Sequence, residues 1–265
     1  MESVDFLYLK QGDVENIINN KSSSDVIIFL SGKSSHDTPL DILRNNDTIA
    51  VNGSATYLIN NDIVPFIYLV TDKKFYQAKP DEFWNSIDKS KYSIISFDLY
   101  NKAKSEDKEV LRRKCLILKD VYTNQFGGPL EIVKYFFKSE KSPDIKIHIP
   151  LFWRSRKVGF SCDIVKGYCP CHTVAFGAMQ IAYSLKYRRI ICSGLDMNES
   201  TGRFYENPES KEKNALPCRL DYDFKKVMAY FIFMQKNVDI KVFNMSTHTR
   251  VPYEVIPFIS PSELG

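Results

Sequence analysis

The stretch HTVAFGAMQIAYSLKYRRIICSGLD, residues 172–196, predicts a helix followed directly by a strand. Small and apolar residues recur at helical spacing through its first half. Basic residues close that half, where they suit the negative end of a helix dipole. The second half is an apolar, β-branched run that ends in polar and glycine residues, as a buried strand does. A helix that leads into such a strand is the repeating unit of an α/β sheet with crossover helices.

Similar apolar runs with polar or glycine endings occur along the whole chain. Strands are predicted in residues 25–32, 48–54, 65–72, 92–98, 115–120, 145–150, 188–196 and 240–246. Helices are predicted in residues 39–44, 55–60, 105–114, 172–186 and 224–236. The expected fold is α/β, a Rossmann-like and mostly parallel sheet with helices on both faces. Ligands bind beyond the carboxyl ends of the strands in such sheets, so the polar endings should gather at one crevice.

Length and composition favour one large domain. The chain has 265 residues, of which 44% are hydrophobic. Its longest apolar run, residues 63–70, is far shorter than the roughly 20 residues needed to cross a bilayer. The N-terminal residues lack the basic start and apolar stretch of a secretory signal, so we expect a cytoplasmic location. Six cysteines in so long a chain do not make a disulfide framework, and Cys162, Cys169 and Cys171 should stay reduced in that compartment.

Positive charge is concentrated in one part of the chain. Residues 131–166 contain eight basic and four acidic side chains, an excess equal to the net charge of +4 of the whole chain. Within them, Trp153 lies beside Arg154, Arg156 and Lys157. We interpret residues 121–170 as a lid or insert that meets an anionic substrate or membrane surface. A solvated basic loop is the alternative, and no nucleic-acid-binding module accompanies the cluster.

The start of the helix at residues 171–173 is a candidate anion site. First-turn amides and the Thr173 hydroxyl could hold a phosphate, and His172 could act as a general base. The alternative is that Thr173 only caps the helix and His172 is an ordinary surface residue. Cys169 and Cys171 precede this helix, but no second cysteine pair follows to complete a zinc site, and no base is placed to activate either thiol. We therefore expect no bound metal.

Two turns that follow predicted strands could present amides to a phosphate. The first contains Gly32 and Ser34, and the second contains Asn52, Gly53 and Ser54. Neither is a nucleotide motif, because the first lacks the earlier glycine of a P-loop and no G-x-G-x-x-G sequence occurs. Ordinary turn chemistry is the alternative for both.

The remaining acids and histidines are weaker candidates. Asp221 and Asp223 could be a D-x-D metal pair, but the apolar spacing after them favours two acids in the first turn of a helix. His148 lies on the polar face of a predicted strand, so an exposed histidine without a role is expected. His248 follows the last strand and is a second candidate base.

Several of these stretches together resemble a known family. Residues 25–32, 49–72, 167–196 and 255–259 are similar to the enterobacterial lipopolysaccharide core proteins that add a third, side-branch Kdo sugar. The resemblance runs from about Asp25 to Ile259 and implies a single glycosyltransferase domain over residues 1–265. It further implies that Kdo is transferred from CMP-Kdo to a Kdo of the lipid-linked inner core, at the cytoplasmic face of the inner membrane.

A weaker resemblance, to bacterial CMP-sialic acid sialyltransferases, implies a nucleotide site. The matching positions are Ser31, Gly32, Ser34, Asn52, Asp72, Thr173 and the SGLD of residues 193–196, which include Ser193, Gly194 and Asp196. The catalytic histidine of those enzymes follows the SGLD-like motif, whereas no histidine occurs here between Met197 and Leu220. The base is therefore sought among His172, Asp72, Asp196 and His248.

The expected chemistry needs no cofactor. A CMP-sugar carries one phosphate, which a helix dipole and hydroxyl donors can stabilise without a metal. The expected partners are thus a CMP-sugar, a lipopolysaccharide acceptor and an anionic membrane surface, and a homo-oligomer is left open. Two alternatives remain, namely a different CMP-nonulosonate donor and a non-catalytic lipopolysaccharide assembly protein.

Overall fold

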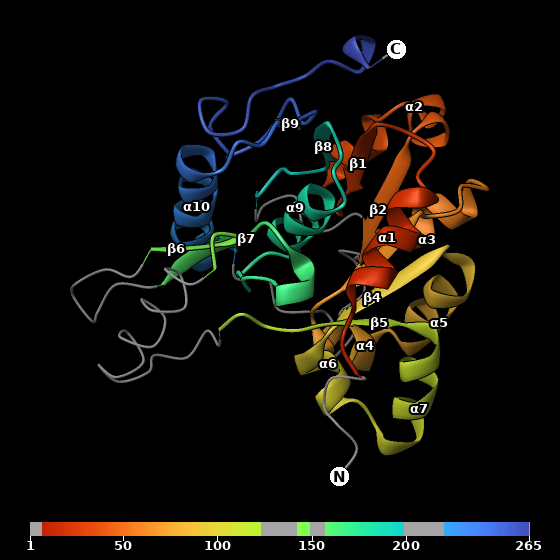
Figure 1. Cartoon of the computed structure of the whole chain (residues 1–265). Helices are drawn as coiled ribbons and strands as arrows, with labels where there is room; N and C mark the ends of the chain where they lie inside the picture. Colours follow the sequence, from red (N-terminus) through yellow and green to blue (C-terminus); the bar gives the residue numbers. More distant parts are fainter. Residues whose placement is uncertain (1–6, 123–141, 149–156, 199–219, 265) are drawn as a thin grey trace.

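The computed structural model describes residues 7–122, 142–148, 157–198 and 220–264. Its centre is a seven-stranded parallel sheet in the order β5-β4-β3-β2-β1-β8-β9 (Figure 1). The strands are β1 (Asp25–Phe29), β2 (Asp47–Val51), β3 (Ile67–Val70), β4 (Tyr92–Ser96), β5 (Leu116–Leu118), β8 (Arg189–Ser193) and β9 (Val242–Asn244). Each coincides with a predicted strand, which confirms the α/β fold.

The sheet is covered on both faces. Side chains alternate along β1, so that Val26 and Ile28 enter one apolar core while Ile27 and Phe29 enter another. All five β1 residues are buried, as expected for a central strand between two helical layers. The predicted covering of both faces is therefore confirmed.

The helices divide between the two cores. One layer contains α1 (Gln11–Asn19), α9 (Val174–Ser184) and α10 (Leu220–Asn237). The other contains α2 (Leu40–Asn45), α3 (Ser54–Asn60), α4 (Lys73–Ala78), α5 (Pro80–Lys89), α6 (Phe97–Lys102) and α7 (Ser105–Lys114). The sequence analysis missed α1, α4, α5 and α6. Six-residue helices such as α4 and α6 are too short to establish a helical period, although Pro80 at the start of α5 is a recognisable start signal.

Strand order reverses at β1. The chain builds β2 to β5 outward on one side of β1 and returns to add β8 and β9 on the other. Ile28 is consequently paired with Ile49 of β2 and with Cys192 of β8. A reversal of this kind opens a crevice beyond the carboxyl ends of the two strands that flank it.

One predicted strand lies outside this sheet. Residues 145–150 were expected to extend the parallel sheet, but β6 (Ile145–His148) pairs antiparallel with β7 (Val158–Ser161), a strand that was not predicted. The expectation was wrong because β6 buries only Ile145 fully, whereas the central strands are buried throughout. A strand with one solvated face suits an antiparallel ribbon. His148 is exposed, as predicted.

The predicted insert, residues 121–170, is described only in part. Its described residues form the β6–β7 ribbon, which lies beside α10 in Figure 1, and a short 3-10 turn, η3 (Ile164–Lys166). Trp153, Arg154 and Arg156 lie outside the described residues. Across the described ranges, no helix has the length and apolar character needed to cross a membrane.

Candidate active site

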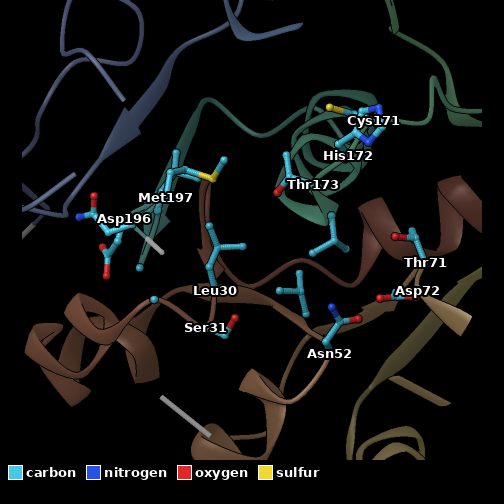
Figure 2. A pocket seen from close by; sticks show the side chains of 16 residues that line it. Leu30, Ser31, Asn52, Thr71, Asp72, Cys171, His172, Thr173, Asp196 and Met197 are labelled. Carbon is cyan, nitrogen blue, oxygen red and sulfur yellow. The ribbon is translucent and has the colours of Figure 1, made fainter. Parts of the chain in front are cut away.

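A pocket of about 360 Å³ opens at the carboxyl edge of the sheet, where the strand order reverses. Its wall is made by residues 30–32 after β1, 51–52 at β2, 71–72 after β3, 171–174 at the start of α9 and 194–198 after β8. Figure 2 shows side chains from these five segments around one space. The predicted convergence of polar strand endings is thus observed.

The start of α9 forms one side of the pocket. Thr173 is its N-cap, and the hydroxyl accepts a hydrogen bond from the amide of Ala175 at 3.3 Å. His172 and Val174 line the pocket on either side of the cap. Because first-turn amides lack partners within their own helix, this end of α9 carries partial positive charge beside the pocket.

Asn52 faces α9 from the other side (Figure 2). It follows β2 in a left-handed conformation with φ of 47°, which asparagine tolerates better than most residues. Its backbone N–H donates to the carbonyl of Leu69 at 3.3 Å, which fixes the turn against β3. The side-chain oxygen Oδ1 is buried without a hydrogen-bond partner. An unsatisfied buried acceptor in a pocket wall is costly unless a ligand supplies the donor.

His172 contacts an acid from another element. Its Nδ1 lies 3.3 Å from Oδ1 of Asp223, and Nζ of Lys226 lies 2.8 Å from the same oxygen. Asp223 falls in the first turn of α10, as predicted for Asp221 and Asp223. The sequence predicted only that Asp223 stabilises the start of this helix. That prediction is incomplete, because the Asp223 carboxylate also contacts His172 of the pocket wall.

Asp196 supports the loops at the crevice. It is 5% exposed, and its Oδ2 accepts from the amide of Ser34 at 3.0 Å while Oδ1 accepts from the Ser34 hydroxyl. That hydroxyl also lies 2.7 Å from the hydroxyl of Ser246. The Ser34 hydroxyl therefore joins the segments that follow β1, β8 and β9.

Two glycines allow these segments to approach closely. A Cβ atom on Gly32 would lie 2.6 Å from Oδ2 of Asp196 and still closer to the carbonyl oxygen of Gly194. Gly194 has φ of +77°, and a Cβ there would lie 2.9 Å from Cβ of Ser35. The loops after β1 and β8 thus cross where no side chain fits.

Comparison with known proteins identifies the family. The family model described as "3-deoxy-D-manno-octulosonic acid transferase WaaZ" matches residues 8–262. The chain belongs to this family.

Two relatives carry the same description, "Probable 3-deoxy-manno-octulosonic acid transferase". The relative from Escherichia coli (strain K12) is 47% identical over 259 residues, which cover 97% of this chain and 90% of the relative. The relative from Salmonella typhimurium (strain LT2) is 43% identical over 265 residues, which cover 100% and 96%. The chain is therefore a glycosyltransferase of the Kdo (3-deoxy-manno-octulosonic acid) transferase family.

The predicted site residues of this Kdo transferase fall into two groups. Those in the pocket wall are Ser31, Gly32, Asn52, Asp72, His172, Thr173, Gly194 and Asp196. Ser34, Gly53, Ser54 and Ser193 are not in the wall. The Ser54 hydroxyl donates to the carbonyl of Phe29 at 2.6 Å, and the Ser193 hydroxyl lies 2.8 Å from that of Thr38, so both belong to the frame below the pocket.

Some wall residues were not predicted. Thr71, Met197 and Asn198 line the pocket, although Thr71 directly precedes Asp72 in a polar strand ending that could have indicated it. Asp72 also caps α4 by accepting from the amide of Lys74 at 2.9 Å. The candidate base His248 lies near Asn198, whose side chain donates to the His248 carbonyl at 2.9 Å.

The two cysteines that precede α9 are not activated. Cys169 is fully buried, and burial raises the pKa of the Cys171 thiol to about 12, which keeps it protonated at neutral pH. In the described part of the chain, no three His, Cys, Asp or Glu side chains are grouped so that they could hold a metal ion.

Proposed function

We propose that this chain transfers Kdo from CMP-Kdo to a Kdo of the lipopolysaccharide inner core, with inversion and without a metal. The observation that carries the proposal is the pocket between the start of α9 and Asn52. There the positive end of the α9 dipole and the unsatisfied Oδ1 of Asn52 face one space. Membership of a Kdo transferase family supports the transferred sugar.

The nucleotide has suitable partners in this pocket. The single phosphate of CMP suits the first-turn amides of α9, with Thr173 as a hydroxyl donor. The buried Oδ1 of Asn52 suits an amine or hydroxyl of the nucleoside. Backbone around Ser31, Gly32 and Gly194 completes the wall, while hydrogen bonds of Ser34, Ser54 and Ser193 keep the loops in place.

Transfer then needs a base but no covalent enzyme intermediate. The acceptor hydroxyl oxygen forms a bond to the anomeric carbon as the bond from that carbon to the CMP phosphate oxygen breaks. His172 takes the hydroxyl proton, and the helix start stabilises the charge that develops on the departing phosphate. Because the acceptor attacks opposite the phosphate, the anomeric configuration inverts.

The acceptor and the membrane are the remaining partners. We propose that the basic stretch of residues 134–166 attracts the carboxylates and phosphates of the lipid-linked core at the cytoplasmic face of the inner membrane. Within it, the described residue Lys157 has its Nζ 5.6 Å from the centre of the Tyr122 ring. Tyr230 of α10 donates to the Lys157 carbonyl at 3.0 Å, which connects this stretch to the helix that carries Asp223.

A direct assay tests the proposal. Purified protein incubated with CMP-Kdo and a Kdo-bearing acceptor should yield an acceptor heavier by one Kdo, identified by mass spectrometry, together with free CMP. A chelator should leave the rate largely unchanged because a helix start rather than a metal meets the monophosphate. Active-site variants serve as the controls. Failure of the unmodified protein to form the product would contradict the function. Loss of activity in the chelator that magnesium restores would contradict metal independence.

Replacing Thr173 with alanine tests the nucleotide site. We expect CMP to bind about fivefold more weakly, since one hydrogen-bond donor is worth roughly 1 kcal/mol. Calorimetric titration with CMP measures the change. Thr247→Ala, which removes an exposed hydroxyl outside the pocket wall, is the control and should bind CMP normally. Unchanged affinity in Thr173→Ala would mean that the hydroxyl only caps α9.

A further inference from the structure

We propose that Asp223 is a positioning residue for His172. In this arrangement the Asp223 carboxylate accepts the hydrogen on Nδ1, which leaves Nε2 unprotonated and able to take the proton of the acceptor hydroxyl. The inference rests on the proposed function, because it assigns His172 the role of general base. It adds a residue from α10, a helix from which no residue with a described side chain lines the pocket.

The distance between the two side chains allows this role. Nδ1 of His172 lies 3.3 Å from Oδ1 of Asp223. The two side chains are 27% and 20% exposed, so water screens their interaction only partly. Hydrogen bonds of catalytic groups are often longer in the free enzyme and shorten when substrate binds.

Lys226 holds the carboxylate in place. Its Nζ lies 2.8 Å from the same Oδ1 atom, and its side chain is 14% exposed. One turn of helix separates the two residues, so the contact fixes the Asp223 side chain against its own helix.

Aromatic packing fixes the two helices relative to each other. Phe176 of α9 contacts Tyr230 and Phe231 of α10, with ring centres 5.2 and 6.1 Å apart. Phe176 and Phe231 are fully buried. Phe176 lies one turn beyond His172, and Tyr230 lies two turns beyond Asp223. The two contacting side chains are thus carried by rigidly packed segments, as a positioning contact requires.

Replacing Asp223 with asparagine tests the role, because asparagine has the same shape but carries an NH₂ donor in place of one carboxylate oxygen. In Asp223→Asn the side-chain NH₂ can donate to Nδ1, which would move the imidazole hydrogen to Nε2 and block proton acceptance. We expect kcat to fall about a hundredfold with KM for CMP-Kdo nearly unchanged. Asp223→Glu, which restores the carboxylate, should recover part of the lost rate.

Nitrogen NMR of the imidazole gives a readout that does not depend on turnover. With ¹⁵N-labelled histidine, the neutral His172 ring should carry its hydrogen on Nδ1 in the unmodified protein and on Nε2 in Asp223→Asn. His172→Gln assigns the signal among the four histidines of the chain. Asp221→Asn removes the same charge from the same helix turn and should leave both the tautomer and kcat unchanged.

The outcomes separate the two proposals. An unchanged tautomer or an unchanged kcat in Asp223→Asn would overturn the positioning role. If the unmodified protein fails to transfer Kdo from CMP-Kdo, the proposed function fails, whereas the tautomer still reports on the contact between His172 and Asp223. If Asp223→Asn does not fold, Asp223→Glu takes its place: a partly lowered kcat with the hydrogen still on Nδ1 supports the role, and an unchanged kcat with the hydrogen moved to Nε2 contradicts it.

Discussion

Replacing His172 with alanine should lower the rate of Kdo transfer by roughly a hundredfold or more while leaving the affinity for CMP nearly unchanged. The imidazole lies at the start of α9 beside the proposed phosphate position, but it supplies none of the proposed contacts to the nucleotide. Its loss should therefore appear in kcat and not in binding. Transfer rates measured by mass spectrometry, paired with calorimetric titration of CMP, separate the two quantities.

His148→Ala is the matched control, because His148 is an exposed residue of β6 and lies outside the pocket wall. It should transfer Kdo at the normal rate. Full activity in His172→Ala would move the search to Asp72 and His248. Asp196 would follow them, since both of its carboxylate oxygens already accept hydrogen bonds from Ser34.

Replacing Gly32 with alanine should lower the free energy of unfolding by about 1–3 kcal/mol and weaken CMP binding. The backbone conformation of Gly32, with φ of −66° and ψ of 150°, is open to alanine, so the effect is purely steric. The new methyl group would press against Asp196 and the Gly194 carbonyl, which must move apart. Chemical denaturation followed by circular dichroism measures the stability.

Gly12→Ala provides a control of opposite sign. Nothing lies within 4 Å of a Cβ atom at this position of α1, and alanine favours a helix more than glycine does. Stability should therefore stay the same or rise slightly. If Gly32→Ala were as stable as the unmodified protein and bound CMP normally, the close crossing of the β1 and β8 loops would not matter for the site.

Much of the fold could be predicted because its signals are local. The apolar runs that became β1, β2 and β8 each carry their own evidence in composition and in a polar ending. Those endings also predicted where the crevice would lie, since the carboxyl ends of parallel strands share one edge. Asn52, Thr173 and His172 were predicted for the site on this ground, and all three line the pocket.

The roles of neighbouring polar residues could not be separated in this way. Ser54 and Ser193 follow or end strands just as Ser31 does, yet their hydroxyls bond to the frame below the pocket. A one-residue step along a strand or turn reverses the direction of a side chain. The last residue of a strand cannot be predicted to within one position. The sequence therefore does not show whether a serine there faces the ligand or the rest of the protein.

The sequence by itself determined the α/β class, the seven strands of the main sheet, the edge of that sheet that carries the site and the helix start beside it, because each depends on neighbours along the chain. Only the tertiary structure decided that β6 pairs with β7, that the Ser34 hydroxyl meets both Asp196 and Ser246, and that Asp223 meets His172. These contacts join segments far apart in the chain, and periodicity and turn chemistry report only on residues within a few positions of each other. Which distant side chains meet is set by how the helices and strands pack, and a pattern along one segment does not contain that information.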